Sequence, residues 1–174
     1  MSTEEVPLSR FLTPWKLQRC AQVGRGVLVL GRVWVRGKGK VKLGDGVVLD
    51  GRFQPIELHA LEPTAEIVLG DDVWLDGGVS IEAVVSVRVG ARTRIGTFAK
   101  VIDNHFHPLL GNRHARPPSL PVTIGEDADI APRAILLAGA QIGDGGSVGP
   151  AAVITRRTIV PPGRTARGMP AVVA

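Results

Sequence analysis

The sequence has little of what a ring-filled or disulfide-stabilised core needs. It contains one cysteine, Cys20, no tyrosine, and 4% aromatic residues among 174 positions. A single cysteine excludes an intramolecular disulfide and favours a reducing, cytoplasmic setting. Because 44% of the residues are nevertheless hydrophobic, the composition predicts a core of small aliphatic side chains stacked in regular rows.

Long hydrophobic runs are also missing. No apolar stretch approaches the ~20 residues of a membrane-spanning helix, and Met1 to Val6 are polar and acidic, unlike a signal peptide. The net charge of +5 favours anionic ligands in general terms. No stacking aromatic residues accompany the basic run 36–42, which argues against a nucleic-acid partner. We therefore expect a cytoplasmic protein with no nucleic-acid partner and no membrane contact.

What is present is a repeat of six residues. An aliphatic side chain returns at Ile124, Ile130, Leu136, Ile142, Val148, Ile154 and Val160. Small or turn-forming residues follow it in many units, so each unit is typical of one short strand and one corner. A helix here would carry repeated Gly and two Pro in its interior, at about 1 kcal/mol per Gly and about 3 per Pro. The pattern predicts an all-β parallel solenoid with the aliphatic residues stacked inside it.

The repeat divides the chain into a main domain and a short leader. It is recognisable from Val23 onward, which predicts one solenoid domain at 23–174. Residues 1–22 contain an apolar patch broken by Pro7 and Pro14, and we expect them to form a cap over the first coil, since an exposed end would leave strand edges unpaired. The alternative is a membrane-surface segment through its aromatic and basic residues.

Two segments break the repeat. Residues 54–64, with Pro55, Glu57 and His59, are predicted to form a loop that protrudes from the solenoid. Residues 103–120 read DNHFHPLLGNRHARPPSL and are predicted to form a second, protruding loop. A loop held between regular coils is a common place for chemistry, because the scaffold fixes it while its sequence is free.

The order of coils, the segment Asn104-His105-Phe106-His107-Pro108 and the restart at 121–125 resemble the hexapeptide-repeat acyltransferases. Together with the closing segments 153–156, 160–163 and 168–171, they are most similar to the maltose and galactoside type of sugar O-acetyltransferase. The resemblance covers residues 23–173. It implies a left-handed parallel β-helix, assembly as a homotrimer, and active sites between subunits that transfer acetyl from acetyl-CoA to a sugar or glycan hydroxyl, as in polysaccharide biosynthesis.

The resemblance also assigns roles to the loop. His107, which stands directly before a proline, takes the place of the general base that removes the proton from the acceptor as it attacks the thioester. His105 is the rival base. Asp103, Asn104 and His105 are expected to shape the loop or contact the acceptor. The carboxylate that orients the imidazole is expected to be Asp76 or Glu82, from earlier coils.

For the cofactor, the family lays the pantetheine arm along the later coils and uses basic side chains for the phosphates. The matching positions here are Ala131, Pro132, Pro150, Ala151, Thr155 and Arg156. Two features depart from the family. No tryptophan precedes Ile130, and the chain given ends at Ala174 without the basic tail of many relatives.

Three other functions stay open at this stage. The same base could acetylate an amino sugar on nitrogen. A left-handed β-helix can also be a zinc carbonic anhydrase, but the histidine pair at one-turn spacing is missing here, and we expect no metal. A non-catalytic scaffold is the third. The sequence does not identify the acceptor, although segments 54–64 and 109–120 are expected to shape its pocket.

Overall fold

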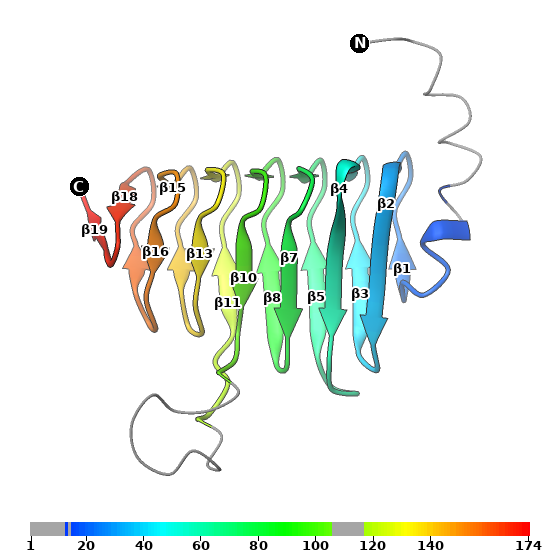
Figure 1. The fold of residues 1–174 in the computed structure, drawn as a ribbon, viewed down its shortest axis with the longest axis horizontal. Helices are drawn as coiled ribbons and strands as arrows, with labels where there is room; N and C mark the ends of the chain where they lie inside the picture. The colour runs from blue at the N-terminus through cyan, green and yellow to red at the C-terminus, as the bar shows by residue number, and fades with distance from the viewer. Residues whose placement is uncertain (1–12, 14, 106–116) are drawn as a thin grey trace, which may run out of the picture.

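The computed structural model describes residues 13, 15–105 and 117–174. This part of the chain is a triangular prism made of strands wound around one long axis (Figure 1). The strands are β1 Gln22–Val23, β2 Leu28–Gly37, β3 Lys40–Leu43, β4 Val48–Ala60, β5 Glu66–Leu69, β6 Trp74–Leu75, β7 Ser80–Ala83, β8 Ser86–Val89, β9 Arg94–Ile95, β10 Lys100–Ile102, β11 Val122–Ile124, β12 Asp129–Ile130, β13 Ile135–Leu136, β14 Gln141–Ile142, β15 Ser147–Val148, β16 Val153–Ile154, β17 Ile159–Val160, β18 Thr165–Gly168 and β19 Ala171–Val173. No helix in the described residues is long and apolar enough to cross a membrane.

The strands form three flat faces. Face one is β1, β3, β5, β8, β11, β14 and β17 in spatial order. Face two is β6, β9, β12, β15 and β18, preceded by the first halves of β2 and β4. Face three is the second halves of β2 and β4 followed by β7, β10, β13 and β16. Pairing between coils is parallel throughout the described strands, which confirms the predicted parallel β-helix.

The helix is left-handed. In Figure 1 the strands of face three run downward at the front and those of face one run upward behind them. The chain then crosses the top from back to front on face two, while it advances from the N-terminal end at the right to the C-terminal end at the left. This path turns counterclockwise as it recedes from the N-terminal end. Crossovers between parallel strands are usually right-handed, so the handedness followed from the family resemblance and not from the general rule.

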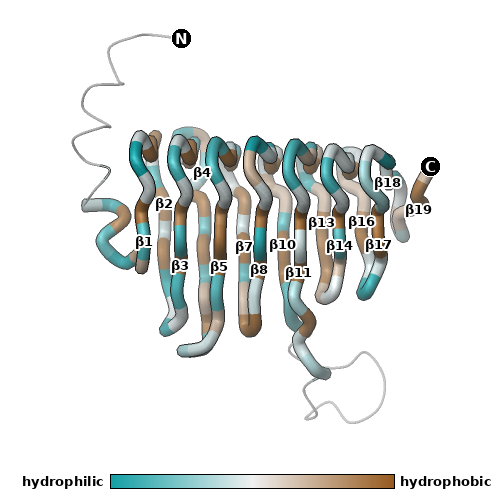
Figure 2. The backbone as a smooth tube through the Cα atoms, turned by 180° about the vertical axis from the view of Figure 1, so that it is seen from behind, coloured by the Kyte–Doolittle hydropathy of each residue, from teal (hydrophilic) through white to brown (hydrophobic). Residues whose placement is uncertain are grey.

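The core consists of aliphatic columns along the prism axis. All seven positions of the six-residue series between 124 and 160 are buried, with 3% exposure or less. Inward and outward residues alternate along each strand, as in β5, where Ile67 and Leu69 point inward. Figure 2 shows the same alternation of hydrophobic and hydrophilic residues. Branched side chains suit the inner side of such a pleated face.

The coils differ in length, and most of the extra residues lie at one corner. A smaller insertion lies in β4, where Gly31 pairs with Gly51 but Val33 pairs with Ile56. Asp129 pairs with Ser147, 18 positions later, which is three six-residue units. Trp74 pairs with Arg94, 20 positions later. The two extra residues lie between β7 and β8, at the corner from face three to face one, so one side of this coil is longer than the others. Arg94 pairs with Asp129, 35 positions later, because segment 103–121 leaves the prism at this same corner.

One predicted loop is wrong. Most of segment 54–64 is the second half of β4, where Ile56, Leu58 and Ala60 are fully buried on face three. Pro55, Glu57 and His59 alternate with them and are not buried. The polar residues that suggested a loop are the outward side of a regular strand. The turn itself is limited to residues 61–65.

Both ends of the prism are covered. At the N-terminal end, Leu17 is 2% exposed in the core and the Thr13 hydroxyl accepts a hydrogen bond from the Val29 amide at 3.2 Å. At the C-terminal end, β19 folds back antiparallel on β18 after a cis Met169-Pro170 peptide. This hairpin follows the last coil of face two.

Candidate functional site

The loop leaves the prism after β10 and returns at β11, at the corner from face three to face one, which we call the loop corner. Its two described ends lie side by side, since the Leu120 amide donates to the Asp103 carbonyl at 2.9 Å. The Leu120 carbonyl in turn accepts from the Gly139 amide of the next coil at 3.1 Å. The loop is therefore attached to the coils on both sides. Residues 106–116, including His107, lie outside the described residues.

Asp103 is a buried carboxylate at the base of the loop. Asp103 follows Ile102, which pairs with Glu82, so it continues the inward column of Ala60 and Ala83, and it is fully buried. Its two carboxylate oxygens accept the amides of Val84 and Val85, at 2.8 and 2.7 Å. These amides belong to the tight corner of the preceding coil. Asp103 thus connects the start of the loop to the corner of the preceding coil.

Asn104 follows as a second buried polar residue, with 4% exposure. Its Nδ2 lies 3.4 Å from Asp103 Oδ1, while its Oδ1 is buried without a hydrogen-bond partner in the described structure. Buried polar atoms are normally paired. The Asn104 oxygen is therefore an acceptor at the base of the loop that is free to receive a donor.

His105, at the outgoing end of the loop, lies within electrostatic range of Arg156. Burial lowers the pKa of the His105 imidazole below its ordinary value of 6.5, and the positive charge of Arg156 lowers it further. Both causes disfavour the imidazolium form. His105 is therefore neutral at neutral pH, as a general base or a hydrogen-bond acceptor must be.

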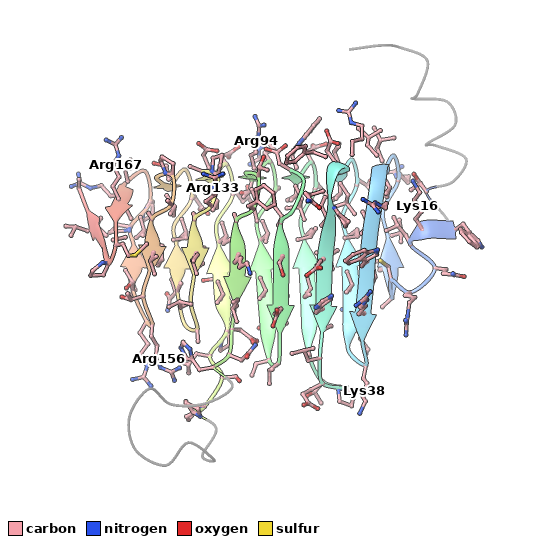
Figure 3. All side chains as sticks on the ribbon, in the orientation of Figure 1. Lys16, Lys38, Arg94, Arg133, Arg156 and Arg167 are labelled. Atoms are coloured by element: carbon pink, nitrogen blue, oxygen red, sulfur yellow. The ribbon has the colours of Figure 1, made fainter. Side chains whose placement is uncertain are left out.

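Arg156 also holds the returning end of the loop. Its Nη2 donates to the Pro118 carbonyl at 2.8 Å, and its Nη1 is buried without a partner in the described part of the chain. Figure 3 shows Arg156 at the loop corner, at the lower edge of the prism. The sequence singled out this residue as a phosphate ligand. The structure adds two features: a hydrogen bond from Nη2 to the returning end of the loop, and a buried Nη1 whose N–H groups have no acceptor in the described residues.

The two candidate orienting carboxylates lie in different places. Glu82 is on β7 and pairs in register with Ile102, immediately before the loop. Asp76 lies at the corner from face two to face three, which we call the far corner, and accepts hydrogen bonds from Trp74 Nε1 at 2.8 Å and Arg94 Nη2 at 2.9 Å. The width of face three separates it from the loop of its own chain. Of the two, Glu82 has the position to support that loop.

The six cofactor candidates also divide between the two corners. Thr155 and Arg156 follow β16 at the loop corner, whereas the other four follow β12 and β15 at the far corner. There the coils stack directly, since the Ala151 amide donates to the Pro132 carbonyl at 3.0 Å. In one chain these two groups lie on opposite edges of face three and do not form one site.

A cavity that the sequence did not indicate lies beside the returning end of the loop. It has a volume of about 550 Å³ and is lined by Leu120, Pro121, Thr123, Gly139, Gln141, Arg157 and Ile159. Arg157, the residue after Arg156, faces this cavity on face one. Nothing in the six-residue pattern marked the cavity, because its wall joins residues from three different coils.

Among the described residues, no three His, Cys, Asp or Glu side chains come together as a metal site. His107 and His114 lie outside the described part. The described site is therefore a set of polar groups around a loop base: two buried acceptors, one neutral imidazole and one guanidinium.

Comparison with known structures identifies the class of fold. No family model matches the sequence, and no curated protein matches it. Among solved structures, a hexapeptide-repeat acetyltransferase from Vibrio cholerae with acetyl-CoA bound is similar at a TM-score of 0.68 and 17% identity, over 99% of this chain and 78% of that one.

Two further structures are similar in the same way. AntD, an N-acyltransferase from Bacillus cereus in complex with dTDP and 3-hydroxybutyryl-CoA, has a TM-score of 0.72 at 16% identity, over 93% of this chain and 86% of that one. A maltose O-acetyltransferase from Clostridium difficile has a TM-score of 0.60 at 18% identity, over 100% and 77%. This chain has the hexapeptide-repeat β-helix fold of these acyltransferases, and the resemblance predicted from its sequence is confirmed at the level of the fold.

Proposed function

We propose that this protein is an acyltransferase that moves an acetyl group from acetyl-CoA to a hydroxyl of a sugar or glycan precursor. The observation that carries the proposal is the cluster of polar groups at the base of the longest interruption of the coils, where the buried Asp103 and Asn104 precede His105, whose pKa is lowered by burial and by the charge of Arg156. Similar structures contain acetyl-CoA or an acyl-CoA, which supports the same choice of donor. The single cysteine supports a cytoplasmic location.

The chemistry needs a base, a donor site and an acceptor. The acceptor oxygen attacks the thioester carbonyl, a new C–O bond forms and the C–S bond breaks. The base takes the acceptor proton and delivers it to the CoA sulfur, which leaves as the thiol. His107 remains the predicted base, with His105 as the described alternative. Arg156, with one unused buried nitrogen, is suited to an anionic group of the cofactor.

A trimer would complete the site. The cofactor candidates of one chain lie on opposite edges of face three, so a groove lined by both groups requires a neighbouring chain. The C-terminal half of face three carries the half-buried apolar residues Ile102, Ile135, Leu137 and Val153 on its outer side. An outward apolar sheet surface is suited to a subunit contact. We propose a homotrimer in which a loop corner meets a far corner.

Transfer to the nitrogen of an amino sugar is the second candidate. It is favoured by the similarity to AntD, an N-acyltransferase, and requires the same base and donor. A panel of sugars and amino sugars, read by release of the CoA thiol, separates the two reactions.

The first test is a calorimetric titration of the purified protein with acetyl-CoA, with free CoA and a simple nucleotide as controls. We expect one acetyl-CoA per chain with a dissociation constant in the micromolar to millimolar range, about −8 to −4 kcal/mol. An absence of both heat and thermal shift at saturating acetyl-CoA would contradict the proposal and support a non-catalytic scaffold.

A further inference from the structure

The aromatic residues of this chain are few, yet three of them gather at one place on the outside of face three. Trp34 and Phe98 line a cavity of about 380 Å³ with Arg32, Gln54, Pro55, Glu57, Gly78, Ser80 and Lys100. Phe53 meets Phe98 edge to face, with ring centroids 6.0 Å apart. The chain has only three Trp and four Phe in all, so this concentration distinguishes the cavity from the aliphatic prism around it.

The floor of the cavity is one row of outward side chains. Strand register places Trp34 beside Glu57, Glu57 beside Ser80, and Ser80 beside Lys100, on four successive strands. Neighbouring strands lie about 4.8 Å apart, so Trp34 and Lys100 stand roughly 14 Å apart along the axis. A ligand in this row would be elongated, with one aromatic ring and one cation at each end: Trp34 and Arg32 on β2, and Phe98 and Lys100 at the start of β10.

The charges of the cavity indicate an anion. Arg32 and Lys100 are both exposed, and neither takes part in an ion pair in the described structure. Arg92 and Arg94, on the neighbouring coil, are by contrast paired with carboxylates. Glu57 lies between the two cations and offers an acceptor for hydroxyl groups. Two free cations, aromatic surfaces and one carboxylate match a phosphate-bearing ligand with a ring and a ribose.

The cavity leads toward the loop. Lys100 begins β10, and Asp103 at the base of the loop is three residues further, roughly 10 Å at 3.3 Å per residue. The next outward row, toward the loop corner, contains Arg36, His59 and Glu82. The His59 Nε2 is buried without a partner in the described part of the chain. Polar groups thus continue from the cavity along face three to the loop base.

We propose that this cavity binds the nucleoside diphosphate part of a nucleotide-linked sugar. The base lies against Trp34, the diphosphate lies near Lys100, and the sugar extends along face three toward the loop. The inference rests on the proposed acyl transfer, because it makes the nucleotide the anchor of the acceptor. It names the acceptor class, which the sequence left open.

The test is fluorescence and calorimetric titration of the full chain with uridine 5′-diphosphate as the probe. Uridine, without charge, and pyrophosphate, without a ring, are the comparison ligands. We expect both to bind at least 10-fold more weakly than the diphosphate. Equal binding of pyrophosphate and the diphosphate would overturn the aromatic part of the site.

Two pairs of matched variants locate the binding. Trp34→Leu should weaken binding of the diphosphate at least 10-fold, while Trp74→Leu, at a tryptophan of equal exposure on face two (37% against 38%), should not. The double variant Arg32→Gln and Lys100→Gln should also weaken binding at least 10-fold. Its control is the double variant Lys38→Gln and Arg167→Gln, which removes equal charge at residues that do not line the cavity. Equal losses in both members of a pair would overturn the assignment.

The two titrations distinguish a failure of the nucleotide-site proposal from a failure of the proposed acyl transfer. Binding of acetyl-CoA without the diphosphate would overturn the cavity assignment alone. Binding of the diphosphate without acetyl-CoA would keep the nucleotide site but overturn its acceptor role together with the proposed acyl transfer. Dissociation of the assembly by Trp34→Leu, measured by sedimentation, would show that a second copy of the chain covers the cavity and would overturn the proposal.

Discussion

Arg156 donates a hydrogen bond from Nη2 to the carbonyl oxygen of Pro118, 38 positions earlier, at 2.8 Å. The contact connects the last part of face three to the returning end of the loop. It also keeps a guanidinium beside His105, whose pKa is lowered by burial and by that charge. The position and the protonation of the loop base therefore depend on a coil that lies two turns beyond the start of the loop.

Removing this charge should raise the pKa of His105. In Arg156→Gln the imidazole is still buried, but it no longer lies near a positive charge. The pKa of His105 should therefore rise toward 6.5 without exceeding it. NMR titration of the imidazole protons measures the shift. Arg157→Gln is the control, because Arg157 is in the adjacent position and faces the other cavity. An unchanged His105 pKa in Arg156→Gln would show that burial alone sets it.

The same shift predicts a dependence of stability on pH. The unfolded chain binds a proton at His105 near pH 6.5, and the folded chain binds it only at lower pH. The unfolded state therefore holds more protons as pH falls below about 6.5, and the folded state loses stability through that window. Thermal unfolding of the protein and of His105→Gln between pH 5 and 8 checks this. The variant should show the smaller loss; an equal loss would remove His105 as its source.

The predicted base is tested by substitution within the loop. His107→Ala should lower the rate of acetyl transfer by about 10²–10⁴-fold, the usual contribution of a general base, with acetyl-CoA binding unchanged by calorimetry. His105→Ala should have a smaller effect on the rate. If His105→Ala removes activity and His107→Ala does not, the base is His105.

Asp103 should stabilise the loop corner through its two amide contacts. Asp103→Asn replaces one accepting oxygen by an NH₂ group that faces the Val84 or Val85 amide. We expect a loss of about 1–3 kcal/mol in the free energy of unfolding, the range for an unpaired buried polar group. Chemical denaturation measures the loss. The exposed Asp129→Asn, on face two, serves as a control that should change stability by less than about 0.5 kcal/mol.

Close stacking of the coils predicts a strong effect at one glycine. A Cβ at Gly90 would lie 2.4 Å from the Gly125 carbonyl carbon and 2.5 Å from the Glu126 amide. Both contacts are to backbone, so Gly90→Ala should cost more than about 3 kcal/mol or prevent folding. Gly163→Ala meets nothing within 4 Å and has a φ of +65°, so it should cost only about 1–2 kcal/mol. Similar losses at the two positions would contradict coil stacking as the cause.

The sequence by itself determined the repeat and therefore the core. Each inward position, such as Ile130 or Leu136, has to be aliphatic because the same environment recurs every six residues. That local signal was strong enough to predict a parallel solenoid and the place where the loop begins. The class of acyltransferases with the same fold was predicted from the resemblance of the loop and the closing segments. It failed at residues 54–64, because alternating polar residues on the outside of a long strand look like a loop when the inner residues are few.

Only the tertiary structure decided how the site residues are distributed. Asp76 and Glu82 are six positions apart, yet they lie on opposite edges of one face. Arg156 lies far from His105 in sequence and beside it in space. In a solenoid, neighbours in space are separated by a full coil, here 18 to 35 positions. Four successive coils have extra residues that shift the register. Contacts across coils, the two cavities and the division of the cofactor residues depend on that register, which the six-residue pattern alone does not contain.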